Sequence, residues 1–518
     1  MGNTKIKIAI IGAGPNGIAS AMPFLEHKDK FDVTLISSGE SLFSEEIITI
    51  QKYLNSVDKN LQHEFWETKK NFSKNFIPKK LFFGNNTVYQ DFENDLKVDK
   101  DIEFDVSHSL GGLSNVWGAT VSGLSQNDLE KYDYVSDFSI YLNTITKIFP
   151  ISGFKDDIDL DTPYKIEYNL ASLKYCTQAK KIMSLYESNK KYFKKNKFRI
   201  GFAKLAMDNN DNSGLEMYGS HKNSVFNSYF YIEKIKKDIY LLENTIVNEI
   251  IYSKNNIYII SKNKKNEITK STYDKVIIAA GVINTAKLVL KLLSNFKKNS
   301  LIIKDSQKYF FLYFTIFKSN KNEEKNIIGL SQIFMQTEIK KNTFQLQLYH
   351  SILLLRDTMN NFLPKKFTKF LIKKLNFIFG RIMIGVVYFP EEISDHMRIK
   401  YNRDEKSFAI TKVKNKNYSV KYILFIYAKL SKFLFRIKSF PLPVFIKAKV
   451  GVSQHFGSSL PPNNEIEVGK TSINGELYPF KNIYITDSSS LSRIPSTPPT
   501  FISMSNAYRV SSEIVNNS

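Results

Sequence analysis

Three glycines close to the N-terminus have a spacing that suits phosphate binding. Gly12, Gly14 and Gly17 form a Gly-x-Gly-x-x-Gly pattern within the stretch IIGAGPNG. Glycines at this spacing make a tight turn and bring backbone N–H groups close to a pyrophosphate, and the dipole of a following helix adds to the attraction. The pattern predicts such a site only where it joins a strand to a helix.

A second glycine-rich stretch, SHSLGGLSNVWGATV at 107–121, surrounds one of the two tryptophans of the chain. The pair Gly111 and Gly112 allows positive φ and a close approach of the backbone to a ligand. The flat ring of Trp117 could then wall off a bound planar ligand. A surface turn with an incidental tryptophan is the alternative interpretation.

The elements around the first glycines follow the order strand, turn, helix, strand. The Ile/Ala run over 5–11 and DVTLIS at 32–37 each predict a buried strand, and apolar residues between them have helical spacing. In this context the glycines are a dinucleotide-binding fingerprint. Ser37 stands where the fingerprint usually has an acidic residue, and we expect its hydroxyl to contact a ribose. Pro23 is expected to kink the helix.

A segment in the middle of the chain is expected to return to the same sheet. The stretch VIIAAGVINTAKLVLKLL predicts a buried strand over 276–280, then Gly281, then an amphipathic helix. An ordinary strand–helix unit is the alternative. The residues just before it, 240–263, predict the strands of a small meander.

The C-terminal segment predicts a third contribution to this sheet. The stretch NIYITDSSS predicts a strand over 483–485 that runs up to Asp487, and a terminal helix begins near Thr500. An acidic residue at a strand end, followed by a helix N-terminus, suits the binding of ribityl hydroxyls and a pyrophosphate together.

Length and composition limit the class of protein. A chain of 518 residues suggests about two to four structural units. The net charge of +23 is compatible with an anionic membrane surface, anionic sugars or a coding bias. No basic run interleaves aromatic residues as in a known nucleic-acid module, so we expect no nucleic-acid partner.

The cysteine count and the apolar runs indicate a compartment. Cys176 is the only cysteine, which excludes an internal disulfide and cysteine-ligated iron–sulfur or structural zinc sites, and no metal site is predicted. No apolar run reaches the ~18 residues of a spanning helix, and the N-terminus lacks the pattern of a signal peptide. We therefore expect a cytoplasmic protein.

Two basic segments, 364–379 and 421–438, have two interpretations. They could be helices that cover a sheet, or interfacial helices on an anionic membrane, which would place the protein peripherally at its inner face. The first segment carries Lys365, Lys366, Lys369, Lys373 and Lys374 among phenylalanines. The second has an apolar stripe at helical spacing, made of Ile423, Ile426, Tyr427, Leu430, Phe433, Leu434 and Ile437.

Five stretches together resemble the glucose–methanol–choline (GMC) family of flavin oxidoreductases, closest to its pyranose-oxidase-like and bacterial polysaccharide-associated branch. They are IIGAGPNG, GGLSNVWG, VIIAAGVINTAKLVL, SQHFGSS and NIYITDSSS…PTFISMSNAYR, in the order of the family. The resemblance implies an α/β (α+β) fold with a Rossmann-like FAD-binding domain and a discontinuous mixed-sheet substrate domain. The implied FAD-binding parts are 1–125, 220–299 and 450–518, and the implied substrate-domain parts are 126–219 and 300–449.

The resemblance also implies FAD as the cofactor. Gly111 and Gly112 would approach the isoalloxazine and pyrophosphate, and Ser114 and Asn115 would contact the flavin. Some relatives attach FAD covalently through a histidine just before the tryptophan. Val116 stands at that position, so we expect non-covalent FAD. The implied cofactor-binding residues are Gly12, Gly14, Gly17, Ser37, Gly111, Gly112, Ser114, Asn115, Trp117, Val247, Ala280, Gly281, Asp487, Ser488 and Thr500.

The stretch SQHFGSS resembles the His-x-x-Gly active-site strand of the family, which implies that His455 is the catalytic base. The family usually adds a second His or Asn before a proline at the start of the last helix. Pro498 stands there instead, and the hydroxyl of Thr497 or Ser496 could partly substitute. His108, beside the Gly-Gly loop, is a second candidate, with a structural role as the alternative.

The expected activity is oxidation of a CH–OH group of an alcohol or sugar-type small molecule by hydride transfer to FAD, in surface glycan biosynthesis. The alternative is a degenerate flavin-binding accessory protein of a glycan pathway without turnover. Ser37 and Pro498 favour the alternative, whereas the presence of His455 favours an enzyme. The sequence does not indicate a particular oligomeric state.

Overall fold

Strand β1 (Ile6–Ile11) lies in the middle of a sheet whose order is β21-β11-β1-β2-β7 and whose pairings are all parallel. Side chains of β1 alternate between two cores, with Ile8 and Ile10 in one and Ala9 and Ile11 in the other. Both faces are therefore buried, as a parallel sheet requires. The other strands come from distant parts of the chain: β2 (Phe31–Ile36), β7 (Tyr240–Leu242), β11 (Lys275–Ile278) and β21 (Ile483–Ile485).

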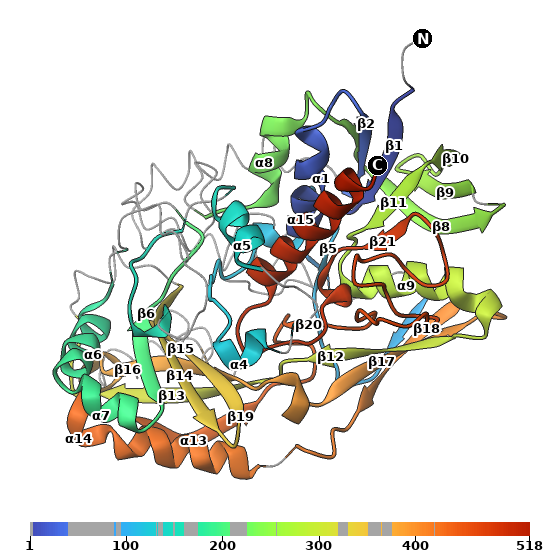
Figure 1. The fold of residues 1–518 in the computed structure, drawn as a ribbon. Coiled ribbons are helices and arrows are strands. Elements are labelled where there is room, and N and C mark those ends of the chain that lie inside the picture. Colours follow the sequence, from blue (N-terminus) through green and yellow to red (C-terminus); the bar gives the residue numbers. More distant parts are fainter. Residues whose placement is uncertain are drawn as a thin grey trace.

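Helices cover both faces of this parallel sheet (Figure 1). On one face α1 (Pro15–Leu25) packs against the terminal helix α15 (Thr500–Asn516), which also contacts α5 (Phe138–Thr146). On the other face lies α9 (Val282–Leu293). Pro23 lies in the last turn of α1, so the helix ends two residues after it. The three segments that were predicted to share one sheet do so.

Smaller elements complete this half. The expected meander consists of β8 (Thr245–Ser253), β9 (Asn256–Asn263) and β10 (Ile268–Tyr273), and β8 contacts α9. Short elements are α8 (Ser228–Ile235), the 3-10 helices η2 (Gly112–Asn115), η5 (Ser294–Phe296) and η8 (Ser488–Ser490), and the pair β3 (Val88–Tyr89) and β5 (Val106–Ser107).

The second half is built on a six-stranded sheet of order β19-β13-β16-β15-β14-β6, and its pairings are all antiparallel. Strand β6 (Phe198–Phe202) comes from an earlier part of the chain than its neighbour β14, so the sheet is discontinuous in sequence. The other strands are β13 (Lys308–Thr315), β14 (Ser331–Ile339), β15 (Asn342–His350), β16 (Ile382–Tyr388) and β19 (Ser439–Lys447).

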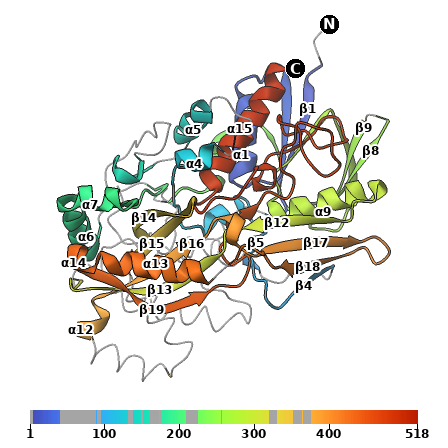
Figure 2. The same cartoon turned by 60° about the horizontal axis from the view of Figure 1, so that its bottom comes forward.

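A mixed sheet of order β20-β12-β17-β18-β4 lies next to α9 and is built from strands of distant parts of the chain (Figure 2). Its one parallel pairing joins β18 to β4, and the others are antiparallel. The strands are β4 (Leu96–Val98), β12 (Ser300–Asp305), β17 (His396–Asn402), β18 (Ser407–Val413) and β20 (Phe456–Gly457).

Helix α13 (Lys421–Lys432) covers the face of the six-stranded sheet that is turned away from the parallel sheet (Figures 1 and 2). Ile423, Ile426 and Leu430 are buried in the core with strand residues such as Phe344. The apolar stripe of 421–438 therefore packs on a sheet, which is the first of the two interpretations of this segment. The neighbouring helices are α6 (Thr177–Ser188), α7 (Lys190–Lys195), α12 (Asn376–Phe379) and α14 (Leu434–Ile437), with α4 (Gln126–Leu129), η3 (Asp157–Asp159) and η7 (Glu391–Ile393) elsewhere.

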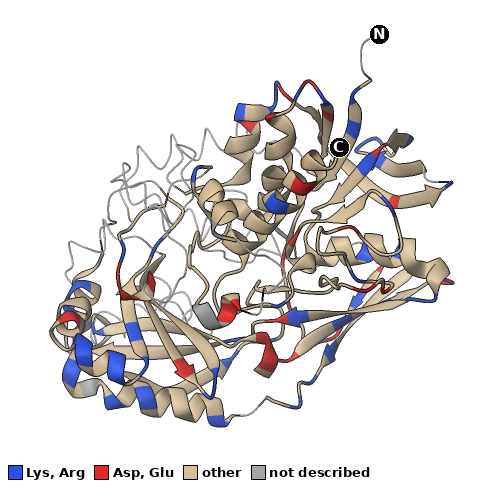
Figure 3. Ribbon diagram, in the orientation of Figure 1, with Lys and Arg blue, Asp and Glu red and all other residues tan. Residues whose placement is uncertain are grey.

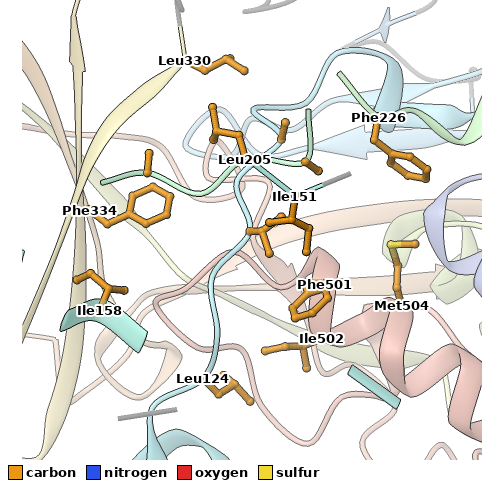
Figure 4. Packing of buried hydrophobic residues seen from close by; sticks show 14 of the residues in the cluster. Leu124, Ile151, Ile158, Leu205, Phe226, Leu330, Phe334, Phe501, Ile502 and Met504 are labelled. Atoms are coloured by element: carbon orange, nitrogen blue, oxygen red, sulfur yellow. The ribbon is translucent and has the colours of Figure 1, made fainter. Parts of the chain in front are cut away.

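Apolar side chains join the two halves (Figure 4). Phe334 of β14 belongs to the same buried cluster as Ile151, Leu205, and Phe501 and Met504 of α15. The structure describes residues 4–39, 88–89, 95–130, 132, 138–148, 151–159, 173, 175–207, 225–254, 256–319, 330–350, 364, 376–418 and 420–518. The lysines at 365–374 lie outside these residues. Within them, no helix has the length and apolar character that crossing a membrane requires.

Candidate functional site

The three glycines of the first turn have three different surroundings. A Cβ atom at Gly12, whose φ is +110°, would lie 2.2 Å from the carbonyl oxygen of Ala279. A Cβ atom at Gly17 would lie 1.8 Å from the carbonyl oxygen of Gly12. At Gly14 the same atom would have no neighbour within 4 Å. Gly12 and Gly17 therefore permit tight packing of strand and helix, whereas Gly14 faces open space at the N-terminus of α1, where a phosphate group fits.

The Gly-Gly loop and the middle segment adjoin this open space. Gly111 and Gly112 have φ values of +96° and +57°, and a Cβ atom on Gly112 would lie 3.7 Å from the Cα atom of Gly14. Gly281 begins α9 with φ +80°, and a Cβ atom there would also have no neighbour within 4 Å. The structure thus brings three predicted glycine elements to the carboxyl edge of the parallel sheet. Ala280 precedes Gly281, and Val247 lies on β8.

Asp487 links the C-terminal segment to the middle one. Its carboxylate accepts hydrogen bonds from the hydroxyl of Thr285 on α9 and, at 2.9 Å, from the backbone N–H of Ser489. Burial raises the pKa of Asp487. Both carboxylate oxygens thus accept hydrogen bonds from the protein. Asp487 was predicted to bind ribityl hydroxyls, and the structure shows that it connects the C-terminal segment to α9. Ser488 begins η8, and Thr500 begins α15 as predicted.

The residues at the end of β2 are held by the chain around His108. The hydroxyl of Ser37 accepts a hydrogen bond from Gly39 N–H at 3.3 Å. His108 Nδ1 lies 3.1 Å from the hydroxyl of Ser38, and a Cβ atom on Gly39 would lie 2.3 Å from the carbonyl oxygen of His108. These contacts favour the structural interpretation of His108.

The polar groups of the Gly-Gly loop have mostly internal partners. The Ser114 hydroxyl donates to Gly111 O at 2.6 Å and accepts from Ser228 N–H at 2.9 Å. Trp117 donates its indole N–H to Phe226 O at 2.7 Å. Asn115 donates to Ser109 Oγ at 2.9 Å, but its Oδ1 is buried and has no hydrogen-bond partner among the described residues. Asn115 is therefore the member of this loop whose side chain has an acceptor left for a ligand.

Further buried hydroxyls precede the terminal helix. The side-chain oxygens of Ser496 and Thr497 are buried, and neither has a hydrogen-bond partner within the described part of the chain. Buried polar groups in native proteins are normally satisfied by protein, water or a ligand. Together with the open spaces at Gly14 and Gly281, these groups fit a large polar cofactor such as FAD.

His455 lies directly beside this cofactor-facing region. It precedes β20, which pairs with β12, and Ser458 N–H donates to Ser488 O at 2.8 Å. A Cβ atom on Gly457 would lie 2.3 Å from Ser488 O, so a glycine is required at this contact. Gly457 follows His455 after one residue, one fewer than the expected His-x-x-Gly spacing, and this short turn is accommodated by the positive φ of Ser458, +49°.

The backbone before His455 is held by a buried carboxylate that sequence reasoning missed. Asp305, at the end of β12, accepts hydrogen bonds from Gly451 N–H at 2.8 Å and from the Ser453 hydroxyl at 2.5 Å. Ser453 Oγ in turn accepts from His455 N–H at 3.0 Å. Gln454 has φ +59°, uncommon for a residue other than glycine, and its side chain donates to Asp105 at 3.0 Å. Such strained backbone persists where the surroundings enforce it, often at functional sites.

The ring of His455 faces the six-stranded sheet. It stacks on Tyr388 of β16, with ring centroids 4.5 Å apart and an interplanar angle of 20°. Gln345 of β15 lies opposite Tyr388 in the register, and Gln347 follows on the same face. Gln345 donates to the hydroxyl of Ser122, from the segment after the Gly-Gly loop, at 3.1 Å. This face is therefore the one turned toward the half that contains the parallel sheet.

The polar character of this face was also missed from the sequence. Tyr349, Gln345 and Gln347 are buried, and Tyr349 donates its hydroxyl proton to Gln347 Oε1. Gln345 Oε1 and Gln347 Nε2 have no hydrogen-bond partner among the residues the structure describes. An available signal was the alternation of polar and apolar residues in NTFQLQLYH, which is typical of a strand with two different faces.

Pro498 is buried at the start of the terminal helix, directly after Thr497. Its side chain offers no donor or acceptor. The hydroxyl of Thr497 is the neighbouring polar group, and it is one of the buried atoms without a described partner. Among the described residues, no group of His, Cys, Asp or Glu is arranged to bind a metal ion.

Comparison with known proteins establishes the fold. No family model matches the chain, and no curated protein matches it in sequence. A mutant of formate oxidase from Aspergillus oryzae RIB40, studied for FAD modification, has a TM-score of 0.63 and 12% identity, over 100% of this chain and 99% of that one. Pyridoxine 4-oxidase from Mesorbium loti has a TM-score of 0.61 and 9% identity, over 99% of both chains. The expected α/β fold, with a Rossmann-like FAD-binding domain, is therefore confirmed.

Proposed function

We propose that the protein is an FAD-dependent oxidoreductase that oxidises the CH–OH group of an alcohol or sugar-type substrate. The observation that supports this most directly is the position of His455. It directly precedes the turn whose Ser458 N–H donates to Ser488 O at the carboxyl edge of the parallel sheet, and its ring lies on Tyr388 at the polar face of the six-stranded sheet. The two solved structures of the same fold are named formate oxidase and pyridoxine 4-oxidase.

The proposed cofactor site is the carboxyl edge of the parallel sheet. The N-terminus of α1 at Gly14 and that of α9 at Gly281 have room for a pyrophosphate and a ribityl chain. Asn115 Oδ1 and the hydroxyl of Thr497 offer unused hydrogen-bonding capacity. When bound, FAD supplies an acceptor for the hydride that leaves the substrate carbon. Val116 at the usual attachment position supports non-covalent binding.

The protein groups would handle the proton and the position of the substrate. His455 would accept the proton of the substrate hydroxyl as the carbon becomes a carbonyl, because a neutral imidazole is a suitable base near neutral pH. The stack on Tyr388 would fix the plane of the imidazole. The remaining acceptor of Gln345, Oε1, and the remaining donor of Gln347, Nε2, would bind further hydroxyls, which favours a substrate with several of them. A role in surface glycan biosynthesis fits such a substrate and is part of the proposal.

A second candidate is a flavin-binding protein without turnover. The buried side chain of Pro498, in place of a second acid–base group, favours it. Purified protein should show a flavin absorbance band in both cases. Under anaerobic conditions, a panel of sugars and alcohols should bleach this band only if the protein is an oxidoreductase. Flavin that stays with acid-precipitated protein would contradict non-covalent binding.

A further inference from the structure

The outer side of α13 and α14 carries exposed apolar residues although the inner side is already packed. Leu424 is 61% exposed and Phe435 is 89% exposed, whereas Ile426 and Leu430 are fully buried. The exposed side chains follow one another at helical spacing along the helix surface. We call this surface the basic–apolar face, and it consists of Val420, Lys421, Leu424, Phe425, Ala428, Lys432, Phe435, Arg436 and Lys438.

The segment that carries this face has charged residues of one sign. Residues 406–449 contain eleven Lys and Arg and no Asp or Glu. Figure 3 shows the basic residues gathered along α13, α14 and the adjacent α7. Arg436 holds these elements together, because it donates to Asn189 Oδ1 at 2.9 Å and lies 4.2 Å from the ring centroid of Tyr192. Lys432 likewise donates to Asn196 at 2.8 Å.

Exposed phenylalanine and leucine beside exposed lysine and arginine suit one kind of partner. A bilayer with anionic lipids offers phosphate groups for lysines and a boundary region into which apolar side chains can insert. A nucleic acid would use the lysines, but its charged phosphate backbone would offer no apolar contact to Leu424 and Phe435. Helix α13 lies along the outside of the molecule, on the side of the six-stranded sheet opposite the parallel sheet (Figures 1 and 2).

We propose that the basic–apolar face docks the protein on the surface of an anionic membrane, with α13 parallel to the bilayer. The inner apolar stripe of α13 stays packed on the six-stranded sheet, and the outer residues Leu424 and Phe435 insert between head groups. The FAD-binding half then points away from the bilayer. This inference does not depend on the proposed reaction, and its test needs no turnover.

Flotation with vesicles tests the proposal. The purified full-length protein should float with vesicles of phosphatidylcholine that contain about one third phosphatidylglycerol, and not with phosphatidylcholine alone. The bound fraction should fall as salt is added, because screening weakens attraction between surface charges. The variant Lys421→Glu/Lys432→Glu should lose binding about tenfold or more. The control Lys264→Glu/Lys265→Glu, which changes the net charge equally on the distant β9–β10 turn, should bind as the wild type does.

A second variant separates insertion from mere charge attraction. Phe435→Trp should show a blue-shifted emission, relative to the wild-type spectrum, when anionic vesicles are added, and brominated lipids should quench it. Phe435→Ser should reduce flotation without changing the melting temperature, since this side chain is almost fully exposed. Protein that stays at the bottom at low salt, or equal loss of binding in both charge variants, would overturn the proposal. Equal binding to DNA of the wild type and Phe435→Ser, with no flotation, would assign the face to nucleic acid instead.

Discussion

The imidazole of His455 stacks on the ring of Tyr388 with centroids 4.5 Å apart, although His455 lies in the turn before β20 and Tyr388 ends β16 of the six-stranded sheet. Near-parallel stacking holds the ring plane, and aromatic pairs of this kind contribute about 0.5–1.5 kcal/mol beyond their buried area. Tyr388 is buried, which raises the pKa of its phenol and keeps it neutral. The histidine is thus oriented by one half of the protein while its backbone is fixed by the other.

Replacement of His455 should separate cofactor binding from chemistry. His455→Ala should keep the flavin absorbance band, because the cofactor-facing glycines are untouched. Substrate-driven bleaching should slow by about 10²-fold or more, which is the usual contribution of a positioned general base. In the wild type, bleaching should also slow toward acid pH, where a protonated imidazole cannot accept a proton. Stopped-flow absorbance gives both results, and an alanine variant as fast as the wild type would remove His455 from the mechanism.

Two glycines of the first turn should respond in opposite ways to substitution. Gly14 has φ −79° and open space at its Cβ position, so Gly14→Val should fold normally and purify without flavin. Gly17→Val should be unstable, because its Cβ atom would collide with the carbonyl oxygen of Gly12. Far-UV circular dichroism, melting temperature and the ratio of flavin to protein absorbance measure these effects. A yellow, fully loaded Gly14→Val variant would show that the pyrophosphate binds elsewhere.

The first βαβ unit could be predicted because its signals are local. A buried run, a glycine turn and a helical period follow one another within 4–37. The contacts between segments that are distant in sequence could not be predicted from such local signals. The hydrogen bond from Thr285 to Asp487 depends on where the middle and C-terminal strands enter the sheet. Asp487 therefore has a structural partner at a position where the sequence suggested only a ligand contact.

The half that contains the six-stranded sheet shows what hydrophobic periodicity cannot predict. The apolar stripe of 421–438 correctly predicts a helix, but the same spacing suits a protein core and a membrane surface. Because Ile426 and Leu430 are buried, this side of the helix packs in the protein core and not on a membrane. The sequence also did not predict the surroundings of the polar face of β15. Its alternation indicates two different faces, but only the tertiary arrangement shows that Gln345 and Gln347 face the cofactor half rather than solvent.

The unused amide oxygen of Gln345 allows stability and activity to be tested apart. A buried acceptor without a partner costs free energy, whereas the hydrogen bond that Gln345 donates to Ser122 stabilises the fold, so Gln345→Met, which has a similar volume, should change the melting temperature little. The same change should remove a contact to a substrate hydroxyl and lower kcat/KM by about tenfold or more, with flavin still bound. Calorimetry and flavin bleaching measure the two effects. Unchanged kinetics for the best substrate would show that Gln345 does not contact it.

Asp305 connects stability to pH through the turn that carries His455. Burial raises the pKa of this carboxyl to about 6, although Ser453 and Gly451 donate hydrogen bonds to it. An unfolded aspartate has a pKa of about 3.9. Between these values the folded protein binds more protons than the unfolded chain, so this residue makes the free energy of unfolding decrease as pH rises from about 4 to about 6. His396, whose Nδ1 accepts from Asp305 N–H, acts in the opposite sense, because burial and Lys304 lower its pKa to about 4.

Substitution by asparagine should isolate the contribution of Asp305 from that of His396. In Asp305→Asn the amide oxygen can still accept from Gly451 N–H, and the amide nitrogen can donate to Ser453 Oγ, so the turn is retained. The difference in unfolding free energy between variant and wild type should shift in favour of the variant by on the order of 2–3 kcal/mol as pH rises from about 4 to about 7. Denaturant unfolding at several pH values measures this difference. A difference that stays constant with pH would show that Asp305 titrates as an ordinary carboxyl and is ionised at little cost. A constant difference together with lost bleaching activity would instead indicate that the charge itself is needed to hold His455.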